Sequence, residues 1–477
     1  PQTILRDLPG DLSTSEAIGH IRALRARAHR GEALEKTDLF GFQKTTHDNT
    51  VELFTDRTYF TQELLPAIDR AEDSIHLAML SFDGGELGQY TADKLIAKKR
   101  ENPDLEVRLI LDNVGSGALF PWQDASRNIE RMRDAGIEVV VNHTLLNGME
   151  HRKLLLVDGR EAYFGGACLS DPYFGNDAYW AAYEQAVVES GDRKAVREAV
   201  FGRDTSVPFA VTREMELPEF HDFGLKFTGS TVNELQAGFL QSWIQHGNHV
   251  DPELSDGAFE SRYFRGSETT RTDGNTSIKI SHGIPKGESE YRQMVLEVVD
   301  EAKETLDINF TYILVPEFME HVRKAADRGV KVRLLMPSEE GIDNIITWWA
   351  SSSYYPDLMA TGNVAIHEFK TYTHCKFMVA DNRMVFTSTG NPELNSWESG
   401  YDEITLIDSP AFAAEVQREI FDKDMTPERS DIVVPAVFEK RSWFDKALEQ
   451  LGLFLVWLFQ RARAPKQPRR NLIEHTA

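Results

Sequence analysis

Two stretches of this chain carry the same succession of hydrophobic and polar positions. In residues 64–71 and 295–302, apolar side chains recur at the three- and four-residue spacing of a helix face. Each stretch is followed, at 75–79 and 306–310, by the alternation of side chains that is typical of a strand. The chain therefore contains a unit of one helix and one strand twice.

The segments after these units are repeated as well. The pattern predicts buried strands at 105–113 and 330–338, and then a helix end, a glycine cap and a strand at 132–143 and 358–369. Corresponding residues lie 223 to 231 positions apart throughout. We infer that one α/β unit occurs twice, and we predict an α/β fold of two tandem domains.

The repeat divides the chain into five parts. Between the copies, the composition shifts to Gly, Ser, Thr and Asp, as is typical of a linker or a surface loop. We predict an N-terminal helical segment at 1–50, a first domain at 51–250, a linker at 251–277, a second domain at 278–425 and a C-terminal amphipathic tail at 426–477.

A short polar motif occurs at the same point of both copies. The motif is HRKLLLVD, with His151, Lys153 and Asp158, in the first copy and HCKFMVAD, with His374, Lys376 and Asp381, in the second. Positions two apart on a strand share a face, so each histidine projects together with its lysine. The aspartates have the opposite parity, and we expect them to bind backbone or a basic partner instead of the substrate.

Two histidines and two lysines that converge on a pseudo-twofold axis suit the chemistry of a phosphodiester. The lysines supply positive charge to the phosphate oxygens. One neutral histidine can attack phosphorus, while the other, protonated, donates to the leaving oxygen. This chemistry requires no cofactor, and the sequence contains no His, Cys and Asp cluster with the spacing of metal ligands.

Each histidine also needs a hydrogen-bond acceptor for its second ring nitrogen. Acidic residues precede apolar, strand-like runs at similar distances after the two motifs, and we assign this part to Glu184 and Glu403. Solvated acids at strand ends would produce the same pattern, so this alternative stays open.

Small polar groups follow both motifs at the position expected for the phosphate. The predicted phosphate-binding residues are Ser388, Thr389 and Asn391 in the second copy and, through their backbone amides, Gly165 and Gly166 in the first. Cys168 of the first copy is a poor donor compared with an amide.

The overall charge restricts the choice of partner. Hydrophobic residues make up 41% of the chain and charged residues 27%, as in soluble globular proteins. The formal net charge of -24 opposes nucleic-acid binding, because phosphate backbones are bound by clustered Lys and Arg. Only Cys168 and Cys375 occur as cysteines, so no disulfide framework is implied.

Basic residues gather near the two ends of the chain. Four arginines lie between residues 22 and 30, where we predict a solvated helix face, with membrane contact as the alternative. The nine-residue apolar run 451–459 is too short to span a bilayer, and basic residues follow it up to 470. We predict an amphipathic helix on a membrane surface. The alternative is a helix docked on the protein's own core.

The doubled motif resembles the HxKxxxxD signature of the phospholipase D superfamily, and the resemblance covers about residues 51–425. Segments 170–175, 232–247 and 311–338 are similar to those of bacterial cardiolipin synthases. The resemblance implies two α-β-α sandwich domains related by a pseudo-twofold axis, with one active site between them. It also implies a phosphatidyl-histidine intermediate, with His151 as the nucleophile and His374 as the general acid and base.

For cardiolipin synthases, the resemblance implies transfer of a phosphatidyl group between phosphatidylglycerol molecules with release of glycerol. We therefore expect a phospholipid partner and a peripheral location on the bacterial inner (cytoplasmic) membrane. A hydrolase that releases phosphatidic acid is the first alternative, and a nuclease or other phosphodiesterase is the second. Two features depart from the family: Cys168 stands where Asn is usual, and the paired N-terminal transmembrane helices of many members are not seen.

Overall fold

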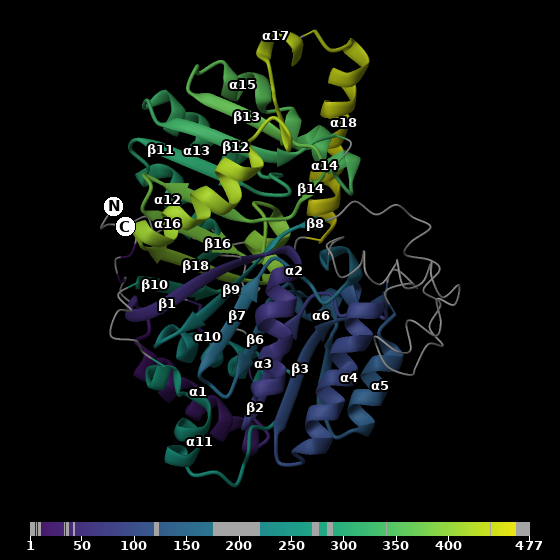
Figure 1. Ribbon diagram of the computed structural model, residues 1–477, viewed down its shortest axis with the longest axis vertical. Helices are drawn as coiled ribbons and strands as arrows, with labels where there is room; N and C mark the ends of the chain where they lie inside the picture. The colour runs from purple at the N-terminus through teal and green to yellow at the C-terminus, as the bar shows by residue number, and fades with distance from the viewer. Residues whose placement is uncertain are drawn as a thin grey trace, which may run out of the picture.

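The structure is a computed structural model with a mixed α/β architecture around one large sheet (Figure 1). The residues that it describes are 5, 7, 11–32, 34, 38–41, 43–118, 124–174, 220–269, 276–283, 290–339, 341–438 and 440–463.

Fifteen strands form the large sheet. From one edge to the other they are β4 (Glu138–Asn142), β3 (Glu106–Asp112), β2 (Ser74–Met79), β6 (Lys153–Val157), β7 (Glu161–Gly165), β9 (Phe223–Thr228), β1 (Thr46–Thr55), β10 (Thr276–His282), β18 (Glu403–Asp408), β16 (Met384–Ser388), β15 (Phe377–Ala380), β11 (Thr305–Asn309), β12 (Lys331–Pro337), β13 (Val364–Phe369) and β19 (Ser430–Ile432). Two short parallel pairs are β5 (Met149–Glu150) with β17 (Gly400–Tyr401), and β8 (Phe220–His221) with β14 (Tyr372–Thr373).

The strand order is nearly symmetric about the centre of the sheet. β1 and β10 pair there. Outward from this pair, the corresponding strands of the two halves follow in the same order. β2, β3 and β4 run parallel to one another on one side, as β11, β12 and β13 do on the other. The repeat is therefore present as two halves related by a pseudo-twofold axis, and a single sheet runs through both.

The helices vary in length from a single turn to more than five turns. They are α1 (Thr14–His29), α2 (Asp56–Thr58), α3 (Leu65–Arg70), α4 (Glu86–Glu101), α5 (Ser126–Asp134), α6 (Thr144–Asn147), α10 (Thr231–Gln245), α11 (Asp256–Tyr263), α12 (Glu290–Glu301), α13 (Pro316–Asp327), α14 (Ile345–Ser352), α15 (Tyr355–Met359), α16 (Pro410–Val416), α17 (Pro435–Phe438) and α18 (Trp443–Arg463). Short π and 3-10 segments are η2 (Tyr59–Leu64), η3 (Val114–Ala118), η5 (Asp171–Tyr173), η6 (Gly266–Thr269), η7 (Asn395–Ser399) and η8 (Gln417–Asp422).

Helices cover both faces of the sheet in each half. In the first half, α3, α4 and α5 pack on one face, and α10 with α1 packs on the other. In the second half, α12, α13 and α15 share one core, and α16 contributes to the core that contains α10. Figure 1 places the first half below and the second half above. This arrangement confirms the predicted α-β-α sandwich class.

Successive side chains of a buried strand point alternately into two different cores. Leu154 and Leu156 of β6 point into the core beneath α10, whereas Leu155 and Val157 point into the core beneath α3 and α4. Successive side chains of a strand face opposite sides of a sheet, so a continuous apolar run can fill both layers. The run after His151 is therefore buried on both faces.

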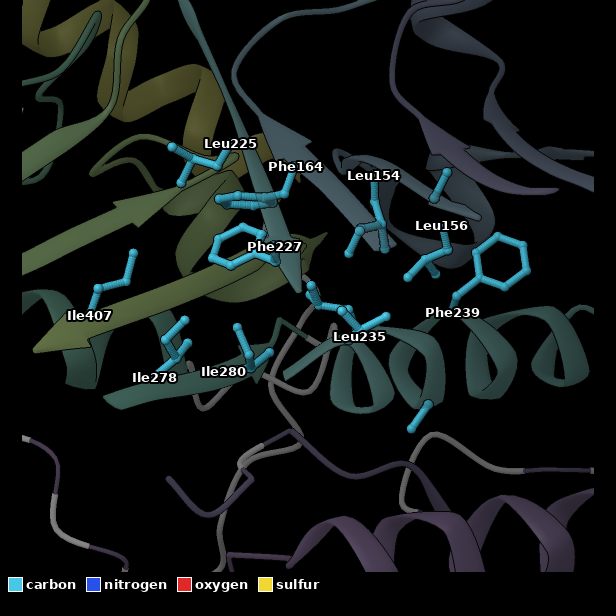
Figure 2. Close-up of a cluster of buried hydrophobic side chains, with 14 of the residues drawn as sticks. Leu154, Leu156, Phe164, Leu225, Phe227, Leu235, Phe239, Ile278, Ile280 and Ile407 are labelled. Atoms are coloured by element: carbon cyan, nitrogen blue, oxygen red, sulfur yellow. The ribbon is translucent and has the colours of Figure 1, made fainter. Parts of the chain in front are cut away.

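One of these cores is common to both halves. Phe164 and Leu225 of the first half lie in the same buried cluster as Ile278 and Ile407 of the second (Figure 2). Burying each such side chain contributes on the order of 1.5–3 kcal/mol. The seam between the halves is thus held by a shared hydrophobic core as well as by the pairing of β1 with β10.

The aspartates of the two motifs hold backbone and do not face the histidines. Asp158 and Asp381 follow β6 and β15 in the left-handed backbone region, with φ of 54° and 52°. The Asp158 carboxylate accepts hydrogen bonds from the amides of residues 72–74, and that of Asp381 accepts from residues 303–305. Their observed contacts agree with the structural role that strand parity predicts.

The interval expected to be a linker is partly helical. Within 251–277, α11 packs on the first half because Phe259 and Tyr263, one turn apart, are both buried in the shared core. Residues 270–275 lie outside the described part. The prediction of a linker or surface loop is therefore wrong for the residues that form α11.

The N-terminal arginines belong to a helix that docks on the protein. Helix α1 packs against α10, and Arg22 pairs with Glu260 at the surface. Arg25 is buried and donates to the carbonyl oxygens of residues 250, 251 and 254. These contacts favour the partly solvated helix face over membrane contact.

Candidate active site

Each motif histidine is held at the seam by backbone of the opposite half. The His151 amide donates to the Tyr401 carbonyl at 2.9 Å, where β5 meets β17. The His374 amide donates to the His221 carbonyl at 2.7 Å, where β14 meets β8. The two histidines therefore lie just before β6 and β15, at equivalent points of the pseudo-twofold frame.

The side chains of the histidines are paired crosswise with aspartates. Nδ1 of His151 lies 2.8 Å from Oδ1 of Asp402, and Nδ1 of His374 lies 2.7 Å from Oδ2 of Asp222. Both aspartates are completely buried. Because each Nδ1 faces a carboxylate, each Nε2 is turned away from it and is the nitrogen placed for chemistry. Each of the two motif histidines therefore takes its carboxylate partner from the opposite half.

The carboxylates that orient the histidines are not the ones expected. Glu403 lies one residue beyond Asp402 on β18, so its side chain points to the other face of the sheet. There it meets Nδ1 of His282 at 2.6 Å and lies 3.6 Å from Arg152. The prediction for Glu403 is therefore wrong. Glu184, its counterpart, lies outside the described residues.

A signal for the missed aspartates exists in the sequence. HDF at 221–223 and YDE at 401–403 each place an aspartate immediately before a strand-like run. The assignment depends on knowing that β8 and β17 cross the seam to pair with β14 and β5. Spacing from the histidine motif carries no information about that cross-pairing, because the intervals differ between the copies.

Both lysines lie buried beside their own histidines. Nζ of Lys153 donates to the His151 carbonyl at 2.8 Å, and Nζ of Lys376 donates to the His374 carbonyl at 2.6 Å. Burial lowers the pKa of Lys376 to about 8, so that its amine still carries a proton for most of the time at neutral pH. Both amines are buried, so solvent screens their interaction with a bound phosphate only weakly.

The four motif residues influence one another electrostatically across the seam. Burial and the charges of Lys376 and Lys153 lower the pKa of His374 well below its usual value. Burial and the charge of Lys153 also lower the pKa of His151, against the opposing influence of Asp402. Without an anion, both rings are therefore held neutral, and a bound phosphodiester would supply the charge that favours protonation.

The two aspartates differ in their hydrogen-bond partners. The Thr389 hydroxyl donates to Oδ1 of Asp402 at 2.7 Å, whereas the corresponding residue of the first copy, Gly166, carries no hydroxyl. Burial would raise the pKa of Asp402, but His151 and Thr389 outweigh it and lower that pKa. Burial raises the pKa of Asp222 to about 7. One His–Asp pair therefore keeps an ionised carboxylate, while the other can take up a proton near neutrality.

The small groups predicted to bind phosphate have other partners. Ser388 donates to the Gly390 carbonyl at 2.8 Å, and the Thr389 hydroxyl is committed to Asp402. The Gly166 amide donates to the Phe223 carbonyl at 3.2 Å. Each of these three donors already has an intramolecular acceptor, and phosphate binding by these residues stays a prediction.

Gly165 and Gly166 allow a neighbouring segment of the chain to approach closely. A side chain at Gly165 would collide with the backbone of Phe223, and one at Gly166 would collide with the carboxylate of Asp222. Asn391 is buried, and its side-chain oxygen lies 3.4 Å from the Tyr312 amide. Cys168, at the position corresponding to Asn391, is a buried thiol whose pKa burial raises. The two copies therefore differ in the polar layer behind their histidines.

Metal ligation is not supported by the arrangement of the described side chains. Among the residues with a described structure, no group of three or more His, Cys, Asp or Glu side chains is placed to hold a metal ion.

Comparison with known proteins gives an independent view of the chain. A family model described as cardiolipin synthase, PLD-like domain, matches residues 64–190 and 295–425. Cardiolipin synthase 1 of Bacillus anthracis is 26% identical over 88% of this chain and 74% of the relative. The cardiolipin synthase of Alkalihalophilus pseudofirmus is 24% identical over 92% of this chain and 76% of the relative.

A solved structure shares the architecture of both halves. Phosphatidylserine synthase from Haemophilus influenzae aligns with a TM-score of 0.61 and 13% sequence identity, over 92% of this chain and 98% of that chain. The similarity extends over nearly the whole of both proteins, so the paired arrangement of the halves is a shared fold.

The hydroxyl of Thr389 provides a test of the asymmetry between the aspartates. We expect Thr389→Val to lower kcat/KM toward a phospholipid by about tenfold or more, because a hydrogen bond to a charged group contributes about 1.5–3 kcal/mol. The pKa of Asp402 rises in the variant, so the loss of activity on acidification begins at a higher pH. Thr389→Ser keeps the donor and is the matched control. A pH–kcat/KM profile of Thr389→Val that overlays the wild type would contradict this account.

Proposed function

Because the chain belongs to the family described as cardiolipin synthase, PLD-like domain, we propose that it is a phosphatidyltransferase acting on phosphatidylglycerol. It transfers the phosphatidyl group of one molecule to a second and releases glycerol. The observation that carries this proposal is the crosswise pairing of His151 with Asp402 and of His374 with Asp222. Two oriented imidazoles beside two buried lysines suit a two-step displacement at a phosphodiester.

In the first step, Nε2 of His151 attacks phosphorus and forms a phosphatidyl-histidine. The bond from phosphorus to the glycerol oxygen breaks, and protonated His374 donates its proton to that oxygen. Lys153 and Lys376 stabilise the negative charge on the phosphate oxygens. Glycerol then leaves the site.

In the second step, a headgroup hydroxyl of another phosphatidylglycerol attacks the phosphatidyl-histidine. Neutral His374 removes the proton of that hydroxyl, the bond from phosphorus to Nε2 of His151 breaks, and cardiolipin is released. His374 is then protonated and His151 neutral, as they were with the first lipid bound. No redox step or additional reactant is required.

The asymmetry of the aspartates supports this division of roles. His151 faces Asp402, whose pKa is lowered, so its ring keeps a proton on Nδ1 and a lone pair on Nε2. His374 faces Asp222, whose pKa burial raises to about 7, so this pair can hold a further proton near neutral pH. The nucleophile His151 thus lies beside the aspartate whose pKa is lowered, and the acid His374 lies beside the aspartate whose pKa is raised.

A hydrolase that releases phosphatidic acid is the alternative closest in chemistry. It follows the same first step, and water replaces the second lipid in the next one. The names of the curated relatives favour transfer, since they are cardiolipin synthases over most of the length of this chain.

Incubation with phosphatidylglycerol vesicles tests the proposal through its products. We expect mass spectrometry to find cardiolipin and free glycerol, and we expect His151→Ala and His374→Ala each to lower the rate by at least about 100-fold. His321→Ala is the matched control. His321 lies on the outer helix α13, and its Nδ1 lies 2.8 Å from Oδ1 of Asp300. If phosphatidic acid were the sole product, the protein would be a hydrolase and not a transferase. Full activity in either motif variant would refute the mechanism.

We also propose that the protein lies peripherally on the bacterial inner membrane, with α18 as a contact. One face of α18 docks on α14: a side chain at Gly452 would lie 2.8 Å from Cβ of Trp349, so the helices approach closely. Leu453 and Val456 pack there with Leu314. This face corresponds to the docked helix that the sequence left open as an alternative.

A second face of α18 supports membrane contact. Its exposed large apolar side chains are Trp443, Phe444, Leu451, Phe454 and Leu458. Basic residues follow in the sequence between 461 and 470. An apolar helix face next to cations suits the interface of an anionic bilayer. Among the helices of the described residues, none is long and apolar enough to cross a membrane.

Charge substitutions on α18 test this contact. We expect Leu451→Glu combined with Leu458→Glu to weaken sedimentation with phosphatidylglycerol vesicles by at least about tenfold, because burial of each leucine contributes about 1.5–3 kcal/mol. Ile432→Glu, which changes an exposed residue outside α18, is the control. Turnover of a short-chain monomeric phosphatidylglycerol reports that the variant is folded. Unchanged vesicle binding in the double variant would exclude α18 as the contact.

A further inference from the structure

The two sides of the paired site differ in their side chains at equivalent positions. Tyr372 and Phe220 are paired in the short sheet beside His374, and their counterparts beside His151 are Met149 and Gly400, which are paired in the other short sheet. The backbone frame is the same on both sides, but aromatic rings occur at these positions only beside His374. A symmetric phosphate needs no such difference, whereas the groups attached to it differ from each other.

Three rings surround His374. The Tyr372 ring stacks on the imidazole with centroids 5.9 Å apart, and the Phe220 ring stacks on it at 6.2 Å. Tyr173 meets it edge-on at 5.3 Å and meets Phe220 at 4.9 Å. Tyr173 and Phe220 are partly exposed, so the rings form an accessible wall beside the imidazole.

Polar groups complete this aromatic wall. The hydroxyls of Tyr312 and Tyr372 lie 2.9 Å apart, and the Tyr312 hydroxyl donates to Oδ1 of Asp343. Asp343 is exposed, and Tyr312 is partly buried. A carboxylate and two phenol hydroxyls are therefore linked in a chain that begins at the ring stacked on His374 and ends at solvent.

The same wall adjoins the surface proposed to meet the membrane. Tyr312 packs against the small cluster that Leu314 and Ala350 form with Val456 of α18. In Figure 1, α18 runs from the far end of the second half toward the seam. A lipid headgroup that approaches from α18 would meet Tyr312 and Asp343 next to His374.

We propose that Tyr312, Tyr372 and Asp343 form the subsite for the polyol headgroup whose hydroxyl leaves or attacks next to His374. This proposal rests on the proposed transferase function, in which His374 exchanges a proton with that hydroxyl. The rings offer faces to the C–H groups of a glycerol unit, and the carboxylate and phenols bind the hydroxyls that do not react. The subsite thereby selects a polyol over water and over simple alcohols.

A competition between soluble acceptors tests the subsite separately from catalysis. Phosphatidylglycerol labelled in its acyl chains is offered to the full-length enzyme with isotopically marked glycerol and 1-propanol at equal concentration. Mass spectrometry measures both transfer products and phosphatidic acid in one reaction. The ratio of the transfer products reports acceptor selection, whereas their sum with phosphatidic acid reports the His–Asp chemistry.

We expect the wild type to prefer glycerol, and we expect Asp343→Asn and Tyr312→Phe to lower this preference by roughly tenfold, since a site built to bind a hydroxyl discriminates against an analogue that lacks it. Tyr354→Phe, which removes a phenol hydroxyl from the N-cap position of α15, is the matched control and should keep the wild-type ratio. An unchanged ratio in both subsite variants would overturn the proposal.

Two other outcomes also have a definite meaning. Phosphatidic acid without either transfer product would refute the transferase function and, with it, the proposed subsite. If ethanolamine replaces 1-propanol in this competition, a wild-type preference for ethanolamine over glycerol that is lost in Asp343→Asn would overturn the polyol assignment in favour of a cationic headgroup held by the rings and the carboxylate.

Discussion

The exchange of aspartates between the two halves is the constraint on which the site depends. His151 of the first half is oriented by Asp402 of the second, and His374 of the second by Asp222 of the first. A buried carboxylate costs free energy unless it is hydrogen-bonded, and each one here obtains its histidine partner only when the halves meet. Assembly of the seam and assembly of the catalytic pairs are therefore the same event.

The rest of the fold holds this seam in place. β1 pairs with β10, a single core runs beneath both halves, and the short strand pairs β5–β17 and β8–β14 bring each aspartate beside the opposite histidine. Beneath each pair, small residues allow a close approach: Gly166 leaves room for Asp222, and Gly390 leaves room for Asp402. The frame is symmetric, but Thr389 and the aromatic wall at His374 make its two sides chemically different.

The sequence predicts the frame well because the frame repeats. Three local patterns are found where the sequence indicates them. They are the helix-then-strand units, the doubled His and Lys motif, and the parity of Asp158 and Asp381. The orienting acids depend on which strands cross the seam, and no local period encodes that. The assignment to Glu403 missed by one residue, and a shift of one residue on a strand turns a side chain to the opposite face. The hydroxyl of Thr389 was expected at phosphate but serves a carboxylate, because burial commits donors to the nearest acceptor.

We propose that His151 is the nucleophile and that His374 serves only to move a proton. A phosphatidyl ester of 4-nitrophenol tests it directly, because this leaving group needs no proton and bypasses the first task of His374. With His374→Ala, we expect a burst of nitrophenolate equal to the enzyme concentration, followed by an acid-labile phosphatidyl adduct on the peptide that contains His151. An adduct on another residue, or a burst-free reaction without any adduct, would contradict it.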